Sequence, residues 1–461
     1  MRYVSTRGAS PTLGFSDVLL TGLAPDGGLY VPETWPNLPP AVDLDAATSY
    51  AECVAAIIQP FVGDDIAASD IATMCDAAYG SFRHDAVVPL VQIGHDQWLA
   101  ELFHGPTLSF KDVALQLIGR LFDHALGQRD ERVTIVGATS GDTGSAAIEA
   151  VRGCDRVDIV MLYPTGGPSE VQRRQMTTVD ARNARAVAVD GSFDDCQDLV
   201  KAMFNDAPFR ARMGLSAVNS INWARVMAQT VYYVTVSRAL RQRVTACVPT
   251  GNFGNIFAGW VAKHMGATVA DFIVASNAND ILTRFVEHGD MSTAAVVPTL
   301  SPSMDIQVSS NFERLLFEMN GRDGGITAEQ LTRFRSVGRL DVESDQRADF
   351  IDGSFQAARY DDDETIAEIA RVYAATGMQI DPHTATATAA ARHFGGDRAT
   401  VSLATAHPAK FPDAVERATG VRPPLPVHLA DLFDRTERTE TLPNDLGAVQ
   451  SYVRSVSRVP A

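Results

Sequence analysis

The pattern that most constrains this chain begins near residue 98, where short β-branched runs alternate with amphipathic helical segments. Such alternation is typical of a parallel sheet with helices on both faces. Two glycine-rich loops interrupt it, each between the end of an apolar strand and the start of a helix. Ligands bind at this position in open α/β sheets. We therefore expect an α/β fold whose ligand site includes both loops.

Each loop belongs to a strand–loop–helix–strand unit. The first unit is predicted as a strand at 133–136, a loop at 137–144, a helix at 145–152 and a strand at 157–162. The second is predicted as a strand at 246–249, a loop at 250–255, a helix at 256–265 and a strand at 272–275. A further strand at 399–404 and a long helix from Asn222 to about residue 240 complete the pattern.

The region before this pattern, residues 1–95, is expected to form a separate N-terminal domain. Residues 22–28 and 32–40 are rich in turn formers, and the apolar spacing between 46 and 82 is helical. Residues 96–461 then form the catalytic domain. Within it we expect a smaller subdomain at about 112–235 and a larger one from the remainder.

Composition excludes several classes of protein. A net charge of −17 disfavours binding to nucleic acid or to an anionic membrane. No apolar run reaches the roughly 18 residues of a membrane helix, and no signal-peptide core follows the N-terminus, so we expect a cytoplasmic protein. The five cysteines are widely spaced without a CxxC pair, which argues against a disulfide framework and against a metal site.

Lysine is rare in this chain. Of the 39 basic residues four are lysines, namely Lys111, Lys201, Lys263 and Lys410. A lysine amine forms covalent bonds to carbonyl compounds, whereas an arginine stays protonated and does not. Lys111 ends the segment His104–Lys111, which precedes an amphipathic helix. It is therefore a candidate nucleophile, although an isolated lysine at such a place is usually solvated.

The two loops offer different chemistry. Residues 250–255, TGNFGN, have two glycines and no basic side chain, which favours binding of a phosphate by backbone N–H groups. A plain turn explains this segment equally well. Residues 137–144, GATSGDTG, contain three hydroxyls and suit a substrate carboxylate. The alternative is a helix cap supplied by Asp142 or Thr143.

Five motifs resemble the long type of the threonine synthase family in order and spacing. They are HGPT-x-SFKD ending near Lys111, TSGDTG at 139–144, NSIN at 219–222 followed by Arg225, GNFGN at 251–255 and TAHPAKF at 405–411. The segments at 3–7 and 25–32 resemble that family's N-terminal domain. The resemblance implies the tryptophan-synthase-β (type II) fold of pyridoxal-phosphate enzymes, with two parallel-sheet subdomains around a cofactor cleft.

The resemblance also implies roles for individual residues. Lys111 is expected to bind pyridoxal 5'-phosphate covalently and to act as the catalytic base. The cofactor phosphate is expected at Gly251, Asn252, Phe253, Gly254 and Asn255. Thr405 would meet the pyridine nitrogen and Asp142 the ring hydroxyl. The substrate carboxylate is expected at Thr139, Ser140 and Thr143, and the substrate phosphate at Ser220, Asn222 and Arg225.

The implied reaction is O-phospho-L-homoserine plus water giving L-threonine plus phosphate, the last step of threonine biosynthesis. We expect a monomer or weak homo-oligomer with this small-molecule substrate. Two alternatives stay open. One is another lyase of the same fold, such as threonine deaminase or cysteine synthase, which needs no second phosphate site. The other is an inactive relative that binds the cofactor. For Arg225, the alternative is an exposed side chain paired with a surface carboxylate.

Overall fold

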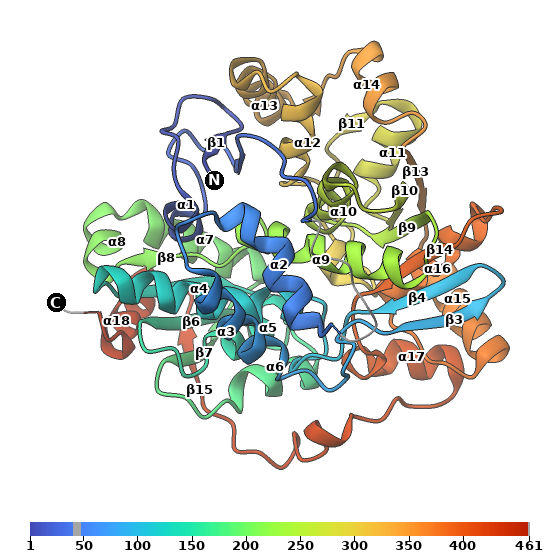
Figure 1. Ribbon diagram of the computed structural model, residues 1–461. Coiled ribbons are helices and arrows are strands. Elements are labelled where there is room, and N and C mark those ends of the chain that lie inside the picture. The colour runs from blue at the N-terminus through green and yellow to red at the C-terminus, as the bar shows by residue number, and fades with distance from the viewer. Residues whose placement is uncertain (40–47, 460–461) are drawn as a thin grey trace. The chain divides into compact units, whose positions relative to one another are not determined.

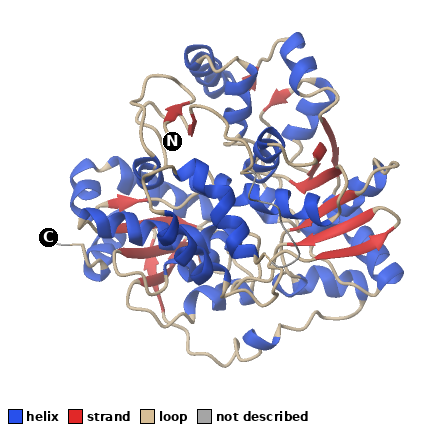
Figure 2. Ribbon diagram, viewed as in Figure 1, coloured by secondary structure: helices blue, strands red, loops and turns tan. Residues whose placement is uncertain are grey.

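The computed structural model describes residues 1–39 and 48–459. They form two compact units, one of residues 1–104 and 220–423 and the other of residues 105–219 and 424–461. Each unit is built around a sheet flanked by helices (Figures 1 and 2). The expected α/β architecture is confirmed. Residue 40 of the predicted turn-rich segment and residues 46–47 of the predicted helical region lie outside the described residues.

The unit of 105–219 and 424–461 contains a five-stranded sheet in the order β15-β7-β6-β5-β8, with all neighbours parallel. Its strands are β5 (Val133–Ala138), β6 (Val157–Pro164), β7 (Ala184–Asp190), β8 (Leu215–Ser216) and β15 (Thr439–Pro443). Its helices are α4 (Lys111–Arg129), α5 (Asp142–Val151), α6 (Glu170–Thr177), α7 (Phe193–Asn205), α8 (Ala207–Met213), η3 (Val427–Leu429) and α18 (Leu446–Val456).

Alternate side chains of these strands form two separate packing layers. Val136, Val160 and Val187 belong to a core that also contains Cys196 and Leu199 of α7 and apolar residues of α8 and α18. Helices α5 and α6 contact strands of the same sheet, and α4 packs on α5. Cover on both faces explains why the central strand β6 is buried at every position rather than at alternate ones.

The other unit contains a six-stranded sheet in the order β13-β10-β9-β14-β4-β3, in which the β3–β4 pair is antiparallel. Its strands are β3 (Leu90–Gly94), β4 (Gln97–Glu101), β9 (Val244–Pro249), β10 (Val269–Ser276), β13 (Phe355–Arg359) and β14 (Thr400–Ala404). Two strand pairs lie outside it, namely β1 (Tyr3–Ser5) with β2 (Tyr30–Pro32) and β11 (Met291–Ser292) with β12 (Arg339–Leu340).

Many helices accompany this sheet in the same unit. They are α1 (Phe15–Thr21), α2 (Tyr50–Val62), α3 (Ala68–Tyr79), α9 (Trp223–Ala239), α10 (Gly254–Met265), α11 (Ile281–His288), η1 (Pro302–Met304), α12 (Phe312–Met319), α13 (Gly324–Val337), α14 (Ser344–Phe350), α15 (Asp362–Thr376), α16 (Pro382–His393), η2 (Pro408–Lys410) and α17 (Pro412–Thr419). Alanines of α16 pack on Cys247 and Ile273, whereas Gly259 of α10 approaches Phe272.

The strands and helices predicted around both loops are confirmed, but both helices begin earlier than expected. Helix α5 starts at Asp142 rather than 145, and α10 starts at Gly254 rather than 256. In each case the end of the glycine-rich loop already forms the first helical turn. A sequence pattern based on apolar spacing does not detect that turn because it contains few apolar residues.

The two compact units have other residue ranges than the domains expected from the sequence. The first 95 residues pack with the larger unit: the Tyr3 hydroxyl donates to the Phe61 carbonyl (2.7 Å) and accepts from the Trp223 indole (3.2 Å). The β3–β4 hairpin spans the expected boundary at 95. Helix α9 contacts α2 and α10, so it does not belong with residues 112–219 as expected. The last 38 residues join the smaller unit through β15.

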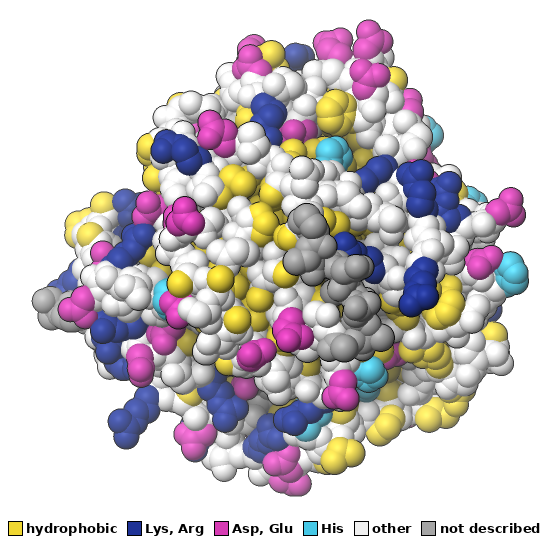
Figure 3. Space-filling model, viewed as in Figure 1, with side chains coloured by type: hydrophobic (Ala, Val, Ile, Leu, Met, Phe, Trp, Pro, Cys, Tyr) yellow, Lys and Arg dark blue, Asp and Glu magenta, His cyan; other side chains and the backbone are white. Residues whose placement is uncertain are grey.

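Four surface and compositional features can be read from the structure. Among the described residues, no helix is both long enough and apolar enough to cross a bilayer. All five cysteines are buried and unpaired with one another. Within the same described ranges, His, Cys, Asp and Glu side chains form no cluster suited to a metal ion. On the face drawn in Figure 3, basic and acidic side chains are interspersed rather than gathered into patches.

Candidate active site

Lys111 is the first residue of α4, and it is buried. The turn before it is held by Asp112, whose carboxylate accepts from the Thr107 N–H (2.8 Å) and hydroxyl (2.7 Å). The Lys111 Nζ lies 3.3 Å from Asp142 Oδ2 and 4.9 Å from the centroid of the Phe110 ring. An amine in such surroundings is shielded from water and held by one carboxylate. The alternative of a solvated Lys111 is therefore wrong.

Leu108, three residues before Lys111, has a left-handed backbone with φ of 64°. For a leucine this conformation costs on the order of 1–3 kcal/mol. Its side chain is fixed in an apolar cluster with Val171, Leu429 and Leu432. The segment that carries Lys111 is thus strained locally and anchored by packing, which is common next to functional groups.

Asp142 is positioned by a glutamine that the sequence pattern did not identify. Gln172 Nε2 donates to Asp142 Oδ1 (2.9 Å). Its Oε1 accepts from the Ser169 N–H and its own N–H donates to the Ser169 hydroxyl, which forms a capping box at the start of α6. A Cβ on Gly141, whose φ is 142°, would lie 2.6 Å from the Gln172 side chain. The Ser-x-x-Gln spacing at 169–172 was the available sequence signal for this helix start.

The loop before α5 presents hydrogen-bond donors. Thr139 Oγ1 accepts from the N–H groups of Gly141 (2.9 Å) and Gly144 (2.8 Å), so Thr139 organises the loop and retains one hydroxyl proton to donate. Ser140 and Thr143 are half-buried, and in the described part of the chain their backbone N–H groups meet no acceptor. Gly141 at the cap position supplies no side chain. Such donors at a helix start favour an anion.

The second loop joins β9 to α10 in the other unit. Phe253 has a left-handed backbone with φ of 62° and gives α10 no side-chain cap. Among the described residues, the N–H groups of 252–256 have no acceptor, and the first such bond runs from Phe257 to the Phe253 carbonyl (2.9 Å). Asn255 Oδ1 accepts from the Tyr232 and Tyr233 hydroxyls, while its buried Nδ2 has no partner. These donors fit a phosphate dianion.

The carbonyl groups of this loop are held by residues from outside it. The Ser309 hydroxyl donates to the Gly251 carbonyl (2.8 Å), and Asn311 donates twice to the Asn252 carbonyl (3.0 and 3.1 Å). Asn311 Nδ2 also reaches the Ser220 carbonyl at 3.2 Å, so it brings the predicted substrate-binding segment beside the loop. Neither Ser309 nor Asn311 lies in a motif, and no local pattern predicts their role.

Three other predicted site residues of the larger unit, Thr405, Asn222 and Ser220, differ in their hydrogen bonding. Thr405 directly follows β14, is buried, and makes no hydroxyl hydrogen bond among the described residues. Asn222 caps α9, accepting from the Ala224 N–H (3.0 Å), and donates to the Leu19 carbonyl (2.8 Å). These bonds use its amide oxygen and one of its two Nδ2 protons. Ser220 is half-buried, with its carbonyl bound by Asn311.

Arg225, in the first turn of α9, is a buried cation. It is 3% exposed, and no carboxylate within the described ranges pairs with it. Its Nε is buried without a hydrogen-bond partner. Burial lowers the pKa of Arg225 to about 10, so the guanidinium stays charged at neutral pH. The alternative of an exposed arginine in a surface ion pair is wrong. An unpaired buried cation favours binding of an anion.

Comparison with known proteins covers nearly the whole chain. Three family models match: threonine synthase N terminus at 2–79, pyridoxal-phosphate dependent enzyme at 89–334, and threonine synthase, C-terminal, at 384–453. Threonine synthase of Pseudomonas aeruginosa is 52% identical over 98% of each chain.

Two solved structures have the same fold over the same extent. Pyridoxal-phosphate-bound threonine synthase from Brucella melitensis matches with a TM-score of 0.97 and 51% identity over 100% of each chain. Yeast threonine synthase matches with a TM-score of 0.93 and 37% identity, covering 99% of this chain and 98% of that one. The type II fold expected from the motifs is confirmed. This chain belongs to the threonine synthase family of pyridoxal-phosphate-dependent enzymes.

Proposed function

We propose that this chain converts O-phospho-L-homoserine and water into L-threonine and inorganic phosphate. Phosphate leaves the γ-carbon of the substrate, and water then adds to the β-carbon. Relatives named threonine synthase at 40–52% identity support the activity. The single observation that carries the choice of a phosphate-ester substrate is Arg225, a buried guanidinium without an anionic partner among the described residues.

The cofactor is pyridoxal phosphate, and the donors described above fit it. We propose that the 251–255 loop holds its phosphate: the orphaned Asn255 Nδ2 and the unpaired N–H groups support this. A Cβ on Gly254 would lie 3.1 Å from Asn311 Nδ2, which leaves little room for a larger residue at this point of the loop. Lys111 is proposed as the covalent attachment point, Thr405 as the partner of the ring nitrogen and Asp142 as a neighbour of the ring hydroxyl.

When bound, the cofactor supplies an electron sink that stabilises negative charge on the substrate carbons. Lys111 Nζ would take the α-proton of the bound substrate and pass protons along its carbon chain. Thr405, a neutral hydroxyl, would leave the ring nitrogen largely unprotonated. Burial of Lys111 beside Phe110 keeps bulk water from the amine.

The substrate is held at both ends in this proposal. Its carboxylate meets the hydroxyls of Thr139, Ser140 and Thr143 together with free N–H groups at the start of α5. Its phosphate meets Ser220, Asn222 and Arg225. A guanidinium donates two parallel hydrogen bonds to one phosphate. This local cation offsets the repulsion expected from a net charge of −17.

The test is to incubate the purified holoenzyme with O-phospho-L-homoserine and to quantify inorganic phosphate and L-threonine together. We expect the two products in equal amounts and in a reaction abolished by Lys111→Ala. Ammonia release from L-threonine without phosphate release would assign a deaminase, and sulfide incorporation a cysteine synthase. Absence of all three activities from cofactor-loaded protein would indicate an inactive relative.

Sedimentation would test the proposed monomer or weak homo-oligomer, and cell fractionation would test the proposed cytoplasmic location.

A further inference from the structure

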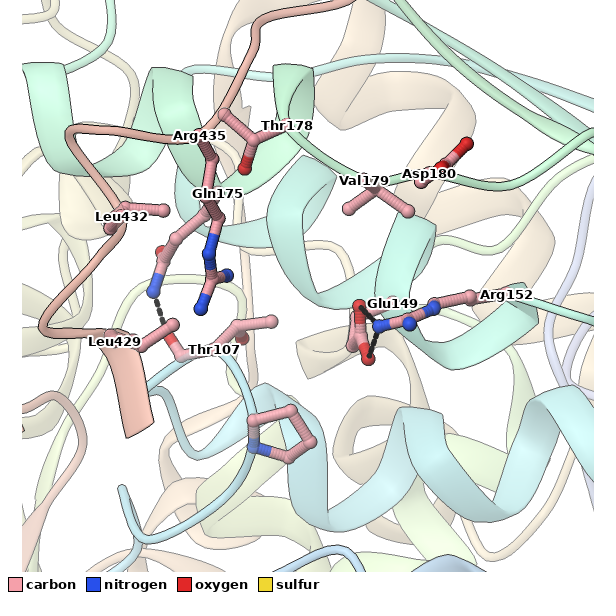
Figure 4. A pocket seen from close by; sticks show the side chains of 11 residues that line it. Thr107, Glu149, Arg152, Gln175, Thr178, Val179, Asp180, Leu429, Leu432 and Arg435 are labelled. Carbon is pink, nitrogen blue, oxygen red and sulfur yellow. Dashed lines mark hydrogen bonds and ion pairs between the residues drawn. The ribbon is translucent and has the colours of Figure 1, made fainter. Parts of the chain in front are cut away.

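A cavity of about 290 Å³ lies within the unit of 105–219 and 424–461. Its walls come from the segment that precedes Lys111, from the ends of α5 and α6, and from the C-terminal segment (Figure 4). Its volume is near the lower limit for small-molecule sites. None of the residues assigned above to cofactor or substrate lines it.

Two carboxylates, Glu149 and Asp180, and two guanidiniums, Arg152 and Arg435, line the cavity, and Asp180 is already paired with Arg438 (3.0 Å). Glu149 accepts from Arg152 Nη1 over long distances, 3.2 and 3.5 Å. Burial raises the pKa of Glu149, because Arg152 and Arg435 compensate the buried carboxylate only in part. Arg435 binds the His428 carbonyl and Asp431 through Nη2, while its Nε and Nη1 meet no acceptor in the described part of the chain. In Figure 4 its guanidinium extends between Gln175 and the Glu149–Arg152 pair.

Apolar and neutral polar groups complete the walls. Leu429, Leu432 and Val179 supply apolar surface. Gln175 Nε2 donates to the Thr107 carbonyl (3.1 Å), but its Oε1 is buried without a partner. A ligand with an ammonium group, a carboxylate and a short side chain matches this combination, since each charged end meets the opposite charge and the side chain meets the leucines.

We propose that this cavity binds a small zwitterionic amino acid at a second site, separate from the active site. The cavity adjoins the segment that carries Lys111. Leu429 and Leu432 pack against the strained Leu108, and the carbonyl of Thr107 is bound by Gln175. Occupation of the cavity therefore rigidifies the entry to α4, and a ligand there couples to the position of Lys111.

Calorimetric titration of borohydride-reduced holoenzyme tests the proposal, because reduction prevents exchange of the cofactor for an added amine. The probes are L-threonine, L-valine, propionate and propylamine. We expect one equivalent of L-threonine or L-valine to bind, and propionate and propylamine to bind at least tenfold more weakly. Glu149→Gln and Arg435→Gln should each weaken binding about tenfold or more. Arg156→Gln, which removes a surface ion pair with Asp130 in the same unit, should leave it unchanged.

Val179→Phe supplies an independent check, because it fills the cavity without changing its charges. It should abolish binding while thermal unfolding shows the protein folded. Three results would overturn the proposal: no binding of either amino acid, equal affinity for propionate, or unchanged affinity in all three cavity variants. Binding at millimolar concentration that ignores Val179→Phe would likewise place the ligand elsewhere.

Discussion

Two buried arginines of one unit show how surroundings distinguish a binding group from a structural one. Arg314 donates to the carbonyls of Tyr30 (3.1 Å) and Ile221 (2.6 Å), and burial lowers its pKa to about 9. Arg225 is as deeply buried, yet its Nε has no partner. The first arginine joins three chain segments. The second has unused binding capacity.

Arg225→Met should separate binding from folding. Replacing an unpaired buried cation with an apolar side chain of similar length is neutral or stabilising, so we expect thermal unfolding at the same or a higher temperature. A lost charge-assisted hydrogen bond is worth about 1.5–3 kcal/mol, so kcat/KM with O-phospho-L-homoserine should fall roughly ten- to a hundred-fold. Steady-state kinetics with cofactor content measured in parallel test this. Unchanged kcat/KM would remove Arg225 from the phosphate site.

Arg314→Met is the matched control and should behave in the opposite way. It removes both hydrogen bonds that Arg314 donates to the Tyr30 carbonyl and the bond that it donates to the Ile221 carbonyl. A buried carbonyl that loses its donor costs about 1–3 kcal/mol, so the unfolding temperature should drop by several degrees. A stable, cofactor-loaded Arg314→Met protein would show that carbonyl binding by this residue does not hold the unit together.

Substitution of Thr405 tests whether this residue sets the protonation state of the cofactor's ring nitrogen. Its buried hydroxyl has no other partner among the described residues, and a neutral partner leaves the ring nitrogen unprotonated. Thr405→Asp should protonate that nitrogen, change the visible spectrum during turnover and raise side reactions such as transamination. Thr405→Ser, which keeps the hydroxyl, should retain both spectrum and products. Identical behaviour of Thr405→Asp and wild type would exclude Thr405 as the ring partner.

At the scale of elements, the turn into α5 depends on Gly141. Its φ of 142° disfavours any side chain, and a Cβ would displace Gln172, which holds Asp142. Gly141→Ala should therefore destabilise the protein by about 1–3 kcal/mol and reduce activity further through Asp142. Gly153→Ala has a positive φ of 78° but open space around it, so it should cost about 1 kcal/mol and leave kcat unchanged. Equal effects of both substitutions on kcat would contradict this role.

The sequence was a good guide to these elements because apolar runs and glycines mark strand ends and helix starts. Both strand–loop–helix units and α9 lie where the pattern predicts them. The sequence pattern did not predict the contacts that support the loops. Ser309 and Asn311 hold the 251–255 loop through contacts that span 58 and 59 residues of sequence, and no local periodicity encodes such a contact. The pairing of the C-terminal strand β15 with β7 could not be predicted for the same reason. The two strands are distant in sequence, and the residues of β15 are mostly polar.

Over the whole molecule, buried thiols and phenols make stability sensitive to alkali. Burial raises the pKa of Cys75 and of Cys154 to about 12, and it raises the pKa values of Tyr232 and Tyr233. Below about pH 9 both folded and unfolded chains keep these protons, so the stability is complete. Above that pH the unfolded chain loses protons that the folded chain retains, and stability falls.

The unfolding temperature should therefore decline steadily from about pH 9 upward. Each retained proton contributes a slope of about 1.4 kcal/mol per pH unit. Thermal scans between pH 7 and 10.5 measure it, and Cys75→Ala combined with Cys154→Ala should make the decline shallower. A decline of equal slope in the double variant would assign the effect to other groups.

Every role proposed for the site requires Lys111 as the covalent attachment point of the cofactor, and a second buried lysine, Lys410, makes this assignment testable. The measurement is borohydride reduction of the yellow holoenzyme, proteolysis and mass mapping of the modified peptide. We expect one pyridoxyl group per chain, on Lys111, and none in Lys111→Ala. A modified Lys410, or a reduced enzyme without any modified lysine, would contradict attachment of the cofactor through Lys111.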